Sequence, residues 1–353
     1  MWSRRDCARW VASAALSAGV PAAMGQIRPV APPVVPRAPI GRVQLAVENK
    51  SAFCYLPLTI AERLGYFAAE GLDVQVRDLS EPGQALQALL SGSVQALSGP
   101  YSLAIRLQAR GQVFPSIVLQ GRAPQVVMGV SRKTMGAFRD VRDLRDRKVA
   151  VTALGSASQR LTQMLLANAR MGSDVVQYVP MGSPSAAVAA FRNGQVDAIC
   201  YTDPVITQLE QDGGLRVVAD TRTVRGNAEV FGGPMPAGCL SVSAEYLASH
   251  PAECQAMVNA MVHALKWLQT AGPSDINKTV PESYFSGDRA LYLAAFSRAR
   301  EAWAPDGLMP ETGPQTVARV LERFEEPSVP KKVDLAQTYT NALAQKAKAR
   351  FRA

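Results

Sequence analysis

Two short polar loops carry the residue types with which this chain would bind a small molecule. The first loop, Gly155-Ser156-Ala157-Ser158, places backbone N–H groups and hydroxyls at the predicted start of a helix. A helix N-terminus carries partial positive charge, so it suits a sulfonate, carboxylate or phosphate group. A serine here can also act only as a helix cap, which contributes about 1 kcal/mol. A cap and a ligand contact are compatible, so we expect the whole loop to contact a ligand.

The second polar loop runs from Tyr201 to Pro204. Its Asp203 would accept a hydrogen bond from an amine or amide of the ligand, and it would repel nitrate or sulfate. The alternative role for Asp203 is to cap the helix that begins after Pro204. We expect Tyr201 and Asp203 to be ligand contacts, which favours an organic solute over a bare inorganic anion.

Two further groups of candidate contacts follow strands in the first half of the chain. Phe53, Cys54 and Tyr55 come after the first predicted strand, and their rings would wall an apolar or ring-bearing ligand. Tyr101 and Ser102 begin a helix, where they would supply a ring and a hydrogen-bond donor. The alternatives are that Phe53 folds into the core and that Tyr101 and Ser102 form a capped turn.

Signatures of catalysis and of metal binding are missing from the sequence. The two histidines, His250 and His263, lie in separate helical segments and have no partners at metal-ligand spacing. No nucleophile elbow, phosphate-binding loop or dinucleotide fingerprint is present. We therefore expect a protein that is not an enzyme and that needs no metal and no cofactor.

Four cysteines would remain in an exported mature chain, at positions 54, 200, 239 and 254. An oxidising compartment permits disulfides, and four cysteines allow three pairings. The sequence does not choose among these pairings. Burial as free thiols is the alternative, and it is the commoner state of an unpaired cysteine.

The elements that position the two polar loops, Gly155–Ser158 and Tyr201–Pro204, form a βαβαβ series. Strands are predicted at 149–151, 175–179 and 196–200, with helices beginning near Arg160 and Ser183. Ligands of such units bind where loops leave the carboxyl ends of the strands. Both polar loops occupy such positions, so the pattern predicts a binding cleft.

The same pattern precedes this series. Strands are predicted at 43–47, 72–76 and 94–97, and the intervening segments have helical periodicity. Gly92 to Leu97 is echoed by Gly194 to Ile199, because each run leads from the glycine that ends a helix into a buried strand. The repetition predicts an α/β protein of two similar lobes, each a mostly parallel sheet flanked by helices.

Composition and segment boundaries complete the domain prediction. The 353 residues are 48% hydrophobic with a net charge of +9, and no aromatic residues interleave with the basic run at 142–148, so we expect no nucleic-acid binding. The predicted segments are a signal peptide of twin-arginine or ordinary secretory type, a proline-rich linker, the first lobe, the second lobe and a return to the first lobe with C-terminal helices: 1–25, 26–41, 42–124, 125–229 and 230–353.

The chain resembles the periplasmic substrate-binding proteins of ABC importers, in the group that binds nitrate, sulfonates, taurine and thiamine pyrimidines. Four segments carry the resemblance: Pro57–Val74, Leu89–Val94, the Gly155-Ser156 loop with its leucine-rich helix, and Ala186–Pro204. Departures from the family pattern occur at Gln95, where aspartate is common, and at Thr202-Asp203, where a tryptophan-glutamate pair is common. These departures leave the expected fold intact and weaken any transfer of ligand identity.

The resemblance implies a two-lobed periplasmic binding protein fold of type II with hinge crossings between the lobes. It implies an exported, monomeric protein that captures a small anionic organic solute and delivers it to an inner-membrane permease. One alternative is a binder of a thiamine-precursor pyrimidine, or a biosynthetic enzyme on the same fold. Another is a ligand-sensing partner of a membrane receptor, which sequence does not separate from transport.

Overall fold

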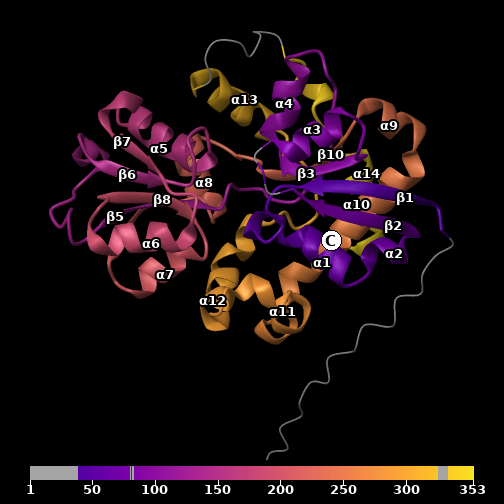
Figure 1. Ribbon diagram of the computed structural model, residues 1–353. Coiled ribbons are helices and arrows are strands. Elements are labelled where there is room, and N and C mark those ends of the chain that lie inside the picture. The colour runs from indigo at the N-terminus through magenta and orange to yellow at the C-terminus, as the bar shows by residue number, and fades with distance from the viewer. Residues whose placement is uncertain (1–38, 80, 82, 325–332) are drawn as a thin grey trace, which may run out of the picture. The chain divides into compact units, whose positions relative to one another are not determined.

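The computed structural model describes residues 39–79, 81, 83–324 and 333–353 (Figure 1). The expected signal peptide lies outside these residues, and so does most of the expected linker. Regular structure begins with a strand at Gly41, close to the predicted end of the linker. Among the described residues, no helix combines the length and apolar character that a membrane crossing requires.

The first sheet contains five strands in the order β2-β1-β3-β10-β4. β1 pairs in parallel with β2 and β3, whereas β10 is antiparallel to both β3 and β4. The bounds are β1 Gly41–Val47, β2 Leu72–Asp78, β3 Ala96–Pro100, β4 Ser116–Leu119 and β10 Gly238–Val242.

The second sheet repeats this arrangement with the order β7-β6-β8-β5-β9. β6 is parallel to β7 and β8, and β5 is antiparallel to β8 and β9. The bounds are β5 Val126–Ser131, β6 Lys148–Val151, β7 Gln177–Pro180, β8 Ala198–Thr202 and β9 Leu215–Asp220. The expected α/β class is confirmed, and both sheets are mixed, because β10 and β5 run against their neighbours.

The echo between the two halves of the sequence corresponds to equivalent strands. β3 and β8 occupy the third position of their sheets. β3 is parallel to β1, and β8 is parallel to β6. Gly92 and Gly194 precede them with φ of +74° and +75°, a left-handed conformation that glycine adopts without steric cost. The chain passes from the first sheet to the second between β4 and β5, and returns between β9 and β10.

Helices cover both faces of the second sheet (Figure 1). The apolar side chains of α5 and α8 pack on one face, and those of α6 and α7 pack on the other. The bounds are α5 Ala157–Asn168, α6 Pro184–Asn193, α7 Val205–Gln211 and α8 Val224–Phe231.

The first sheet carries α3 on one face and a larger helical layer on the other. The long helix α10 is central to this layer, and its side chains Met257, Met261, Leu265 and Leu268 form a buried stripe, each 0% exposed. The remaining α-helices are α1 Leu56–Arg63, α2 Tyr66–Ala69, α3 Gln84–Leu90, α4 Ser102–Gln108, α9 Ala244–Ser249, α10 Pro251–Thr270, α11 Pro273–Thr279, α12 Arg289–Ala299, α13 Gly313–Phe324 and α14 Ala342–Phe351.

Short 3-10 helices connect several of these elements. Their bounds are η1 Phe53–Tyr55, η2 Val141–Leu144, η3 Ser173–Val175, η4 Glu282–Phe285, η5 Arg300–Ala302 and η6 Leu335–Gln337. η1 is the next element after β1, and it carries three of the predicted contacts, Phe53, Cys54 and Tyr55.

The four cysteines of the described chain are free thiols. Cys200, Cys239 and Cys254 are buried, which is the structural role left open by the sequence. The two histidines pack against rings: His263 stacks on Tyr66 with 3.8 Å between ring centroids, and His250 stacks on Tyr246.

Candidate functional site

A cavity of about 190 Å³ lies where the carboxyl ends of strands from both sheets meet. Pro100 ends β3, Thr202 ends β8, and Thr152 directly follows β6. Gly238 and Val126, which begin β10 and β5, complete the wall. These two strands run antiparallel to their neighbours, so their amino ends reach the same edge as the carboxyl ends of the others.

Four of the residues predicted from sequence line this cavity. We call the first sheet with its helices the first half of the molecule, and the second sheet with its helices the second half. Cys54 and Tyr55 come from η1 of the first half, and Ala157 and Ser158 come from the first turn of α5 in the second half. The structure therefore brings together two predicted loops that are about a hundred residues apart in the sequence.

Two further cavities adjoin this one, because they share its wall residues. A cavity of about 80 Å³ shares Pro100, Pro124, Ala157 and Ala237 and is also lined by the predicted residues Tyr101 and Ser102. The second, of about 520 Å³, shares Thr202. Its wall includes the predicted residues Phe53 and Asp203.

The serine loop combines helix capping with a place at the cavity. The Ser156 hydroxyl accepts a hydrogen bond from the Gln159 N–H at 3.4 Å and so caps α5. The Ser158 hydroxyl lies 2.7 Å from that of Ser156 and accepts from the Thr152 N–H at 2.9 Å. These bonds fix the start of α5 against β6, and N–H groups in the first helical turn lack partners within the helix.

Three predicted contacts lie outside the walls of these cavities. Gly155 has φ of +75°, and its N–H donates to the Gln159 side chain at 2.6 Å. Ser156 caps α5, as described above. The Tyr201 hydroxyl donates to the Met181 carbonyl at 2.6 Å, which joins β8 to the end of β7. We assign these three residues a positioning role, and direct contact with a ligand stays a prediction.

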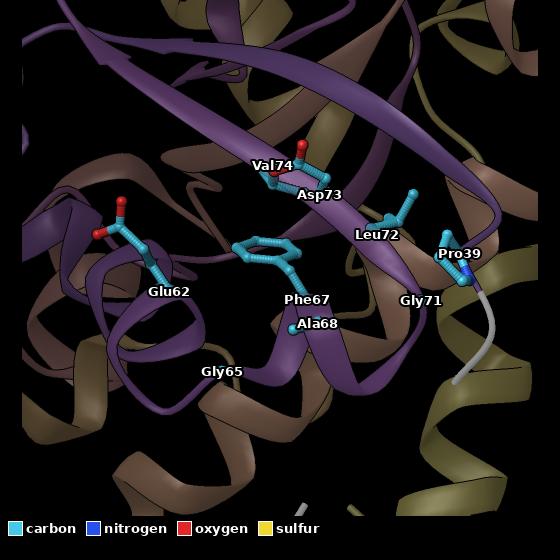
Figure 2. A pocket seen from close by; sticks show the side chains of 9 residues that line it. All are labelled: Pro39, Glu62, Gly65, Phe67, Ala68, Gly71, Leu72, Asp73 and Val74. Atoms are coloured by element: carbon cyan, nitrogen blue, oxygen red, sulfur yellow. The ribbon is translucent and has the colours of Figure 1, made fainter. Parts of the chain in front are cut away.

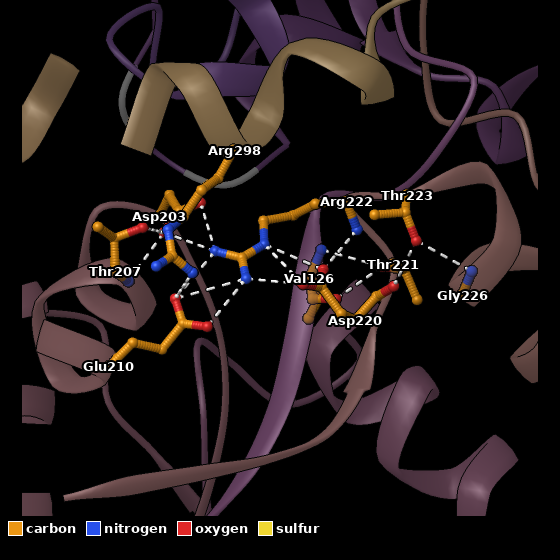
Figure 3. Close-up of polar contacts among 10 residues, drawn as sticks. All are labelled: Val126, Asp203, Thr207, Glu210, Asp220, Thr221, Arg222, Thr223, Gly226 and Arg298. Atoms are coloured by element: carbon orange, nitrogen blue, oxygen red, sulfur yellow. Dashed lines mark hydrogen bonds and ion pairs between the residues drawn. The ribbon is translucent and has the colours of Figure 1, made fainter. Parts of the chain in front are cut away.

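Asp203 has its carboxylate engaged by protein groups (Figure 3). Its Oδ1 accepts from the N–H and hydroxyl of Thr207 at 3.0 and 2.7 Å, which is the capping role considered from sequence. Its Oδ2 lies 3.1 Å from the Arg222 guanidinium. Both oxygens of Asp203 are therefore held by donors of the protein, and Arg222 shares its charge between Asp203 and two further carboxylates.

Arg222 is the buried centre of a charged cluster. Its side chain is 3% exposed and binds Asp203, Glu210 and Asp220, with the shortest ion pair at 2.7 Å to Asp220. Burial alone would lower the pKa of Arg222, but the hydrogen bonds and charges of these three carboxylates raise it above its usual value. Arg222 is therefore a permanent cation behind the cavity wall.

Aromatic rings from two distant segments form one wall of the 520 Å³ cavity. Phe53 stacks on Tyr292 of α12 with 4.6 Å between centroids, and Phe285 packs edge-on against Tyr292 at 5.1 Å. The Tyr292 hydroxyl is buried and has no hydrogen-bond partner among the described residues. An unsatisfied buried hydroxyl costs stability, so a bound molecule that pairs with it would be favoured.

Burial keeps the cysteine and tyrosine side chains of the 190 Å³ and 80 Å³ cavities neutral. Burial raises the pKa of Cys54 to about 12, and burial followed by the neighbouring Cys54 raises the pKa of Tyr55. Tyr101 is 0% exposed, and its hydroxyl is hydrogen-bonded to Thr338. A protonated thiol is a poor nucleophile, so Cys54 serves as a small wall residue here.

Another pocket, of about 380 Å³, lies at the beginning of the edge strand β2 (Figure 2). It is lined by Phe67, Ala68 and Asp73, among others, and by none of the predicted contacts. Because it lies away from the carboxyl ends of the strands, we do not assign it to the ligand site. Among the described residues, no group of three or more His, Cys, Asp or Glu side chains is placed to hold a metal.

The sequence reasoning missed several residues of the site. Neither Tyr292 nor Arg222 was among the predicted contacts, and Arg222 stands between two threonines with no local signal. The wall residues Pro124 and Ala237 belong to the connections between the sheets, and Gly238 begins β10 directly after one of them. Only the knowledge that both connections pass the strand ends would have identified them.

Comparisons with known proteins agree with this geometry. A family model described as the NMT1-like family matches residues 49–280. A solved structure from Bordetella bronchiseptica RB50 is 41% identical, with a TM-score of 0.78, and the match covers 88% of this chain and 98% of that one. The "putative binding protein YtlA" of Bacillus subtilis is 23% identical over 86% of this chain and 89% of the relative.

A more distant solved structure shows the same fold. It is the periplasmic aliphatic sulphonate binding protein SsuA of Escherichia coli, with 22% identity and a TM-score of 0.64. The match covers 84% of this chain and 91% of that one. YtlA and SsuA are named as binding proteins and not as enzymes.

Proposed function

Because the chain belongs to the NMT1-like family, we propose that it is the exported solute-binding component of an ABC import system. The names of the similar proteins support a binding role, and the predicted signal segment supports export. In this proposal the protein captures a small organic solute and delivers it to a permease in the inner membrane.

The observation that carries the proposal is the cavity at the strand ends. It is enclosed by η1 and β3 of one half, by β8 and the start of α5 of the other, and by both inter-sheet connections. A ligand that fills it touches both halves at once. Contacts to both halves are what allow a ligand to shift a hinged protein toward its closed state.

An anionic group on the solute is supported by the start of α5. This twelve-residue helix directs its positive end, through Ala157 and Ser158, to the cavity. Such a terminus favours a sulfonate, carboxylate or phosphate oxygen. We place the acidic group of the solute there. The wall residues described for this cavity include no lysine or arginine, so the helix terminus would supply the positive charge.

The remainder of the solute extends toward the larger cavity. Its wall combines the rings of Phe53 and Tyr292 with hydroxyl and amide groups, so it accommodates an organic moiety with hydrogen-bonding groups. A bare oxyanion would leave this space unfilled. The aromatic wall also favours the second candidate, a binding protein for a thiamine-precursor pyrimidine, whose ring would stack there.

Native mass spectrometry of freshly purified protein tests the proposal. We expect a co-purified solute, or a melting shift with members of a panel of sulfonates, carboxylates, phosphates and pyrimidines. A protein with neither a bound solute nor a shift would contradict a binding role. Turnover of the bound compound would point to an enzyme instead.

A further inference from the structure

Two helices from different halves both line the 520 Å³ cavity. α7 contributes Val205 and Gln208 to the wall, and α12 contributes Leu291 and Tyr292. α7 packs on the second sheet, whereas α12 packs in the core of the first. The spacing between these helices therefore sets the width of the cavity.

An ion pair joins the same two helices. The Arg298 Nη1 of α12 lies 2.7 Å from the Glu210 Oε2 of α7. The Glu210 side chain is 15% exposed and that of Arg298 is 45% exposed. Arg298 lies about two turns beyond Leu291, and Glu210 lies two residues beyond Gln208, so the pair lies along the helices that form the walls.

Arg222 fixes the acceptor of this pair (Figure 3). Its Nη2 lies 3.3 Å from the Glu210 Oε1, and its Nη1 lies 3.1 Å from the Asp203 Oδ2. Asp203 is itself a residue of the cavity wall. The cluster thus connects the wall of the cavity to the carboxylate that Arg298 reaches from the other half.

The charges of the cluster favour this connection. Asp203, Glu210 and Asp220 bring three negative charges, and Arg222 supplies one positive charge from within the second half. The remaining negative potential attracts a cation, and Arg298 supplies it from α12. Glu210 is mostly buried and held by Arg222, so the pair loses less side-chain freedom than two exposed side chains would.

The geometry points to a latch: the Glu210–Arg298 ion pair holds α7 and α12 together at the cavity, with Arg222 as the positioning residue. The role of the latch in retaining a solute rests on the function proposed above. The latch itself acts on the spacing between the halves, and this spacing can be measured in protein without ligand.

Spin-label distance measurements test the latch. Labels at Asn193→Cys on α6 and Lys278→Cys on α11, both exposed positions, report the distance between the halves in a Cys54→Ser background. In ligand-free protein we expect Arg298→Ala to increase the population of long distances about threefold, the ratio typical of an ion pair of this kind. Raising sodium chloride from about 0.05 M to about 1 M should move the parent protein in the same direction.

Two variants control for general effects. Arg298→Lys keeps the positive charge and should restore most of the parent distribution. Arg225→Ala removes an ion pair of equal type within α8, with Glu229 at 2.8 Å, and should leave the distances unchanged. Thermal unfolding of each variant checks that the fold is intact.

Unchanged distances in Arg298→Ala, or an equal change in Arg225→Ala, would overturn the latch. A co-purified solute together with unchanged distances would remove the latch and leave the binding function standing. A change in distance, combined with a parent protein that shows neither a co-purified solute nor a melting shift, would support the latch and count against the binding function.

Discussion

At the scale of single residues, the site is built from neutral groups held in place by buried charges. Cys54 and Tyr55 are kept protonated by burial, and Asp203 is paired with Arg222. The sequence identified Cys54, Tyr55 and Asp203 because each follows a strand. It did not identify Arg222, because the partner of a buried carboxylate is determined by tertiary contacts.

Cys54 should be unreactive toward alkylation in the folded protein. Its pKa is raised from 9.0 to about 12, so at pH 8 the thiolate is about a thousandfold scarcer than in the unfolded chain. The raised pKa contributes stability that is fully present below pH 9 and is lost as pH rises toward 12. Iodoacetamide labelling with and without urea, followed by mass spectrometry, measures the ratio of rates. Equal rates would show that the pKa of the Cys54 thiol is not raised in the folded protein.

Asp203→Asn should destabilise the protein by about 2 kcal/mol, because a neutral amide would weaken the buried hydrogen bonds that the carboxylate accepts from Thr207 and Arg222. Arg42→Ala removes the exposed Arg42–Asp73 pair, whose side chains are 68% and 54% exposed, and should change stability by less than about 0.5 kcal/mol. Urea unfolding of both variants makes the comparison. A smaller loss for Asp203→Asn than for Arg42→Ala would contradict the role given to Arg222.

At the scale of elements, the strands and helices near the site were largely predictable. The predicted strand at 149–151 lies within β6, and the glycines at 92 and 194 mark the entries to β3 and β8. The antiparallel placement of β5 and β10 was not predictable, because a buried strand has the same apolar pattern in either direction. That placement brings the inter-sheet connections to the cavity.

Ser156→Ala should separate the two roles of the serine loop. Loss of the cap costs about 1 kcal/mol of stability, and Ser243→Ala, which removes the equivalent cap of α9, should cost a similar amount. Of the two variants, only Ser156→Ala should weaken binding of the solute identified by mass spectrometry, because α5, unlike α9, begins at the cavity. Calorimetric titration and thermal unfolding give both quantities. Equal binding by the two variants would reduce Ser156 to a cap.

At the scale of the whole molecule, the predicted duplication is visible in the two sheets, which share one strand order. The sequence suggested this from one short echo, because the same local pattern recurred in the same place. The way in which the cavities join could not be predicted from the sequence, because it depends on contacts among η1, α5 and α12, which are far apart along the chain.

Solute binding by two matched tryptophan variants tests the central claim most directly. Ala157→Trp places a large ring where two of the adjoining cavities meet, whereas Ala68→Trp places the same ring at the pocket beside β2. Both alanines are exposed helical residues, so the fold should tolerate either change. Calorimetric titration with the co-purified solute should show at least about a tenfold loss of affinity for Ala157→Trp, equal to about 1.4 kcal/mol, and no loss for Ala68→Trp. Full affinity in Ala157→Trp, or a loss confined to Ala68→Trp, would contradict the placement of the site between the two sheets.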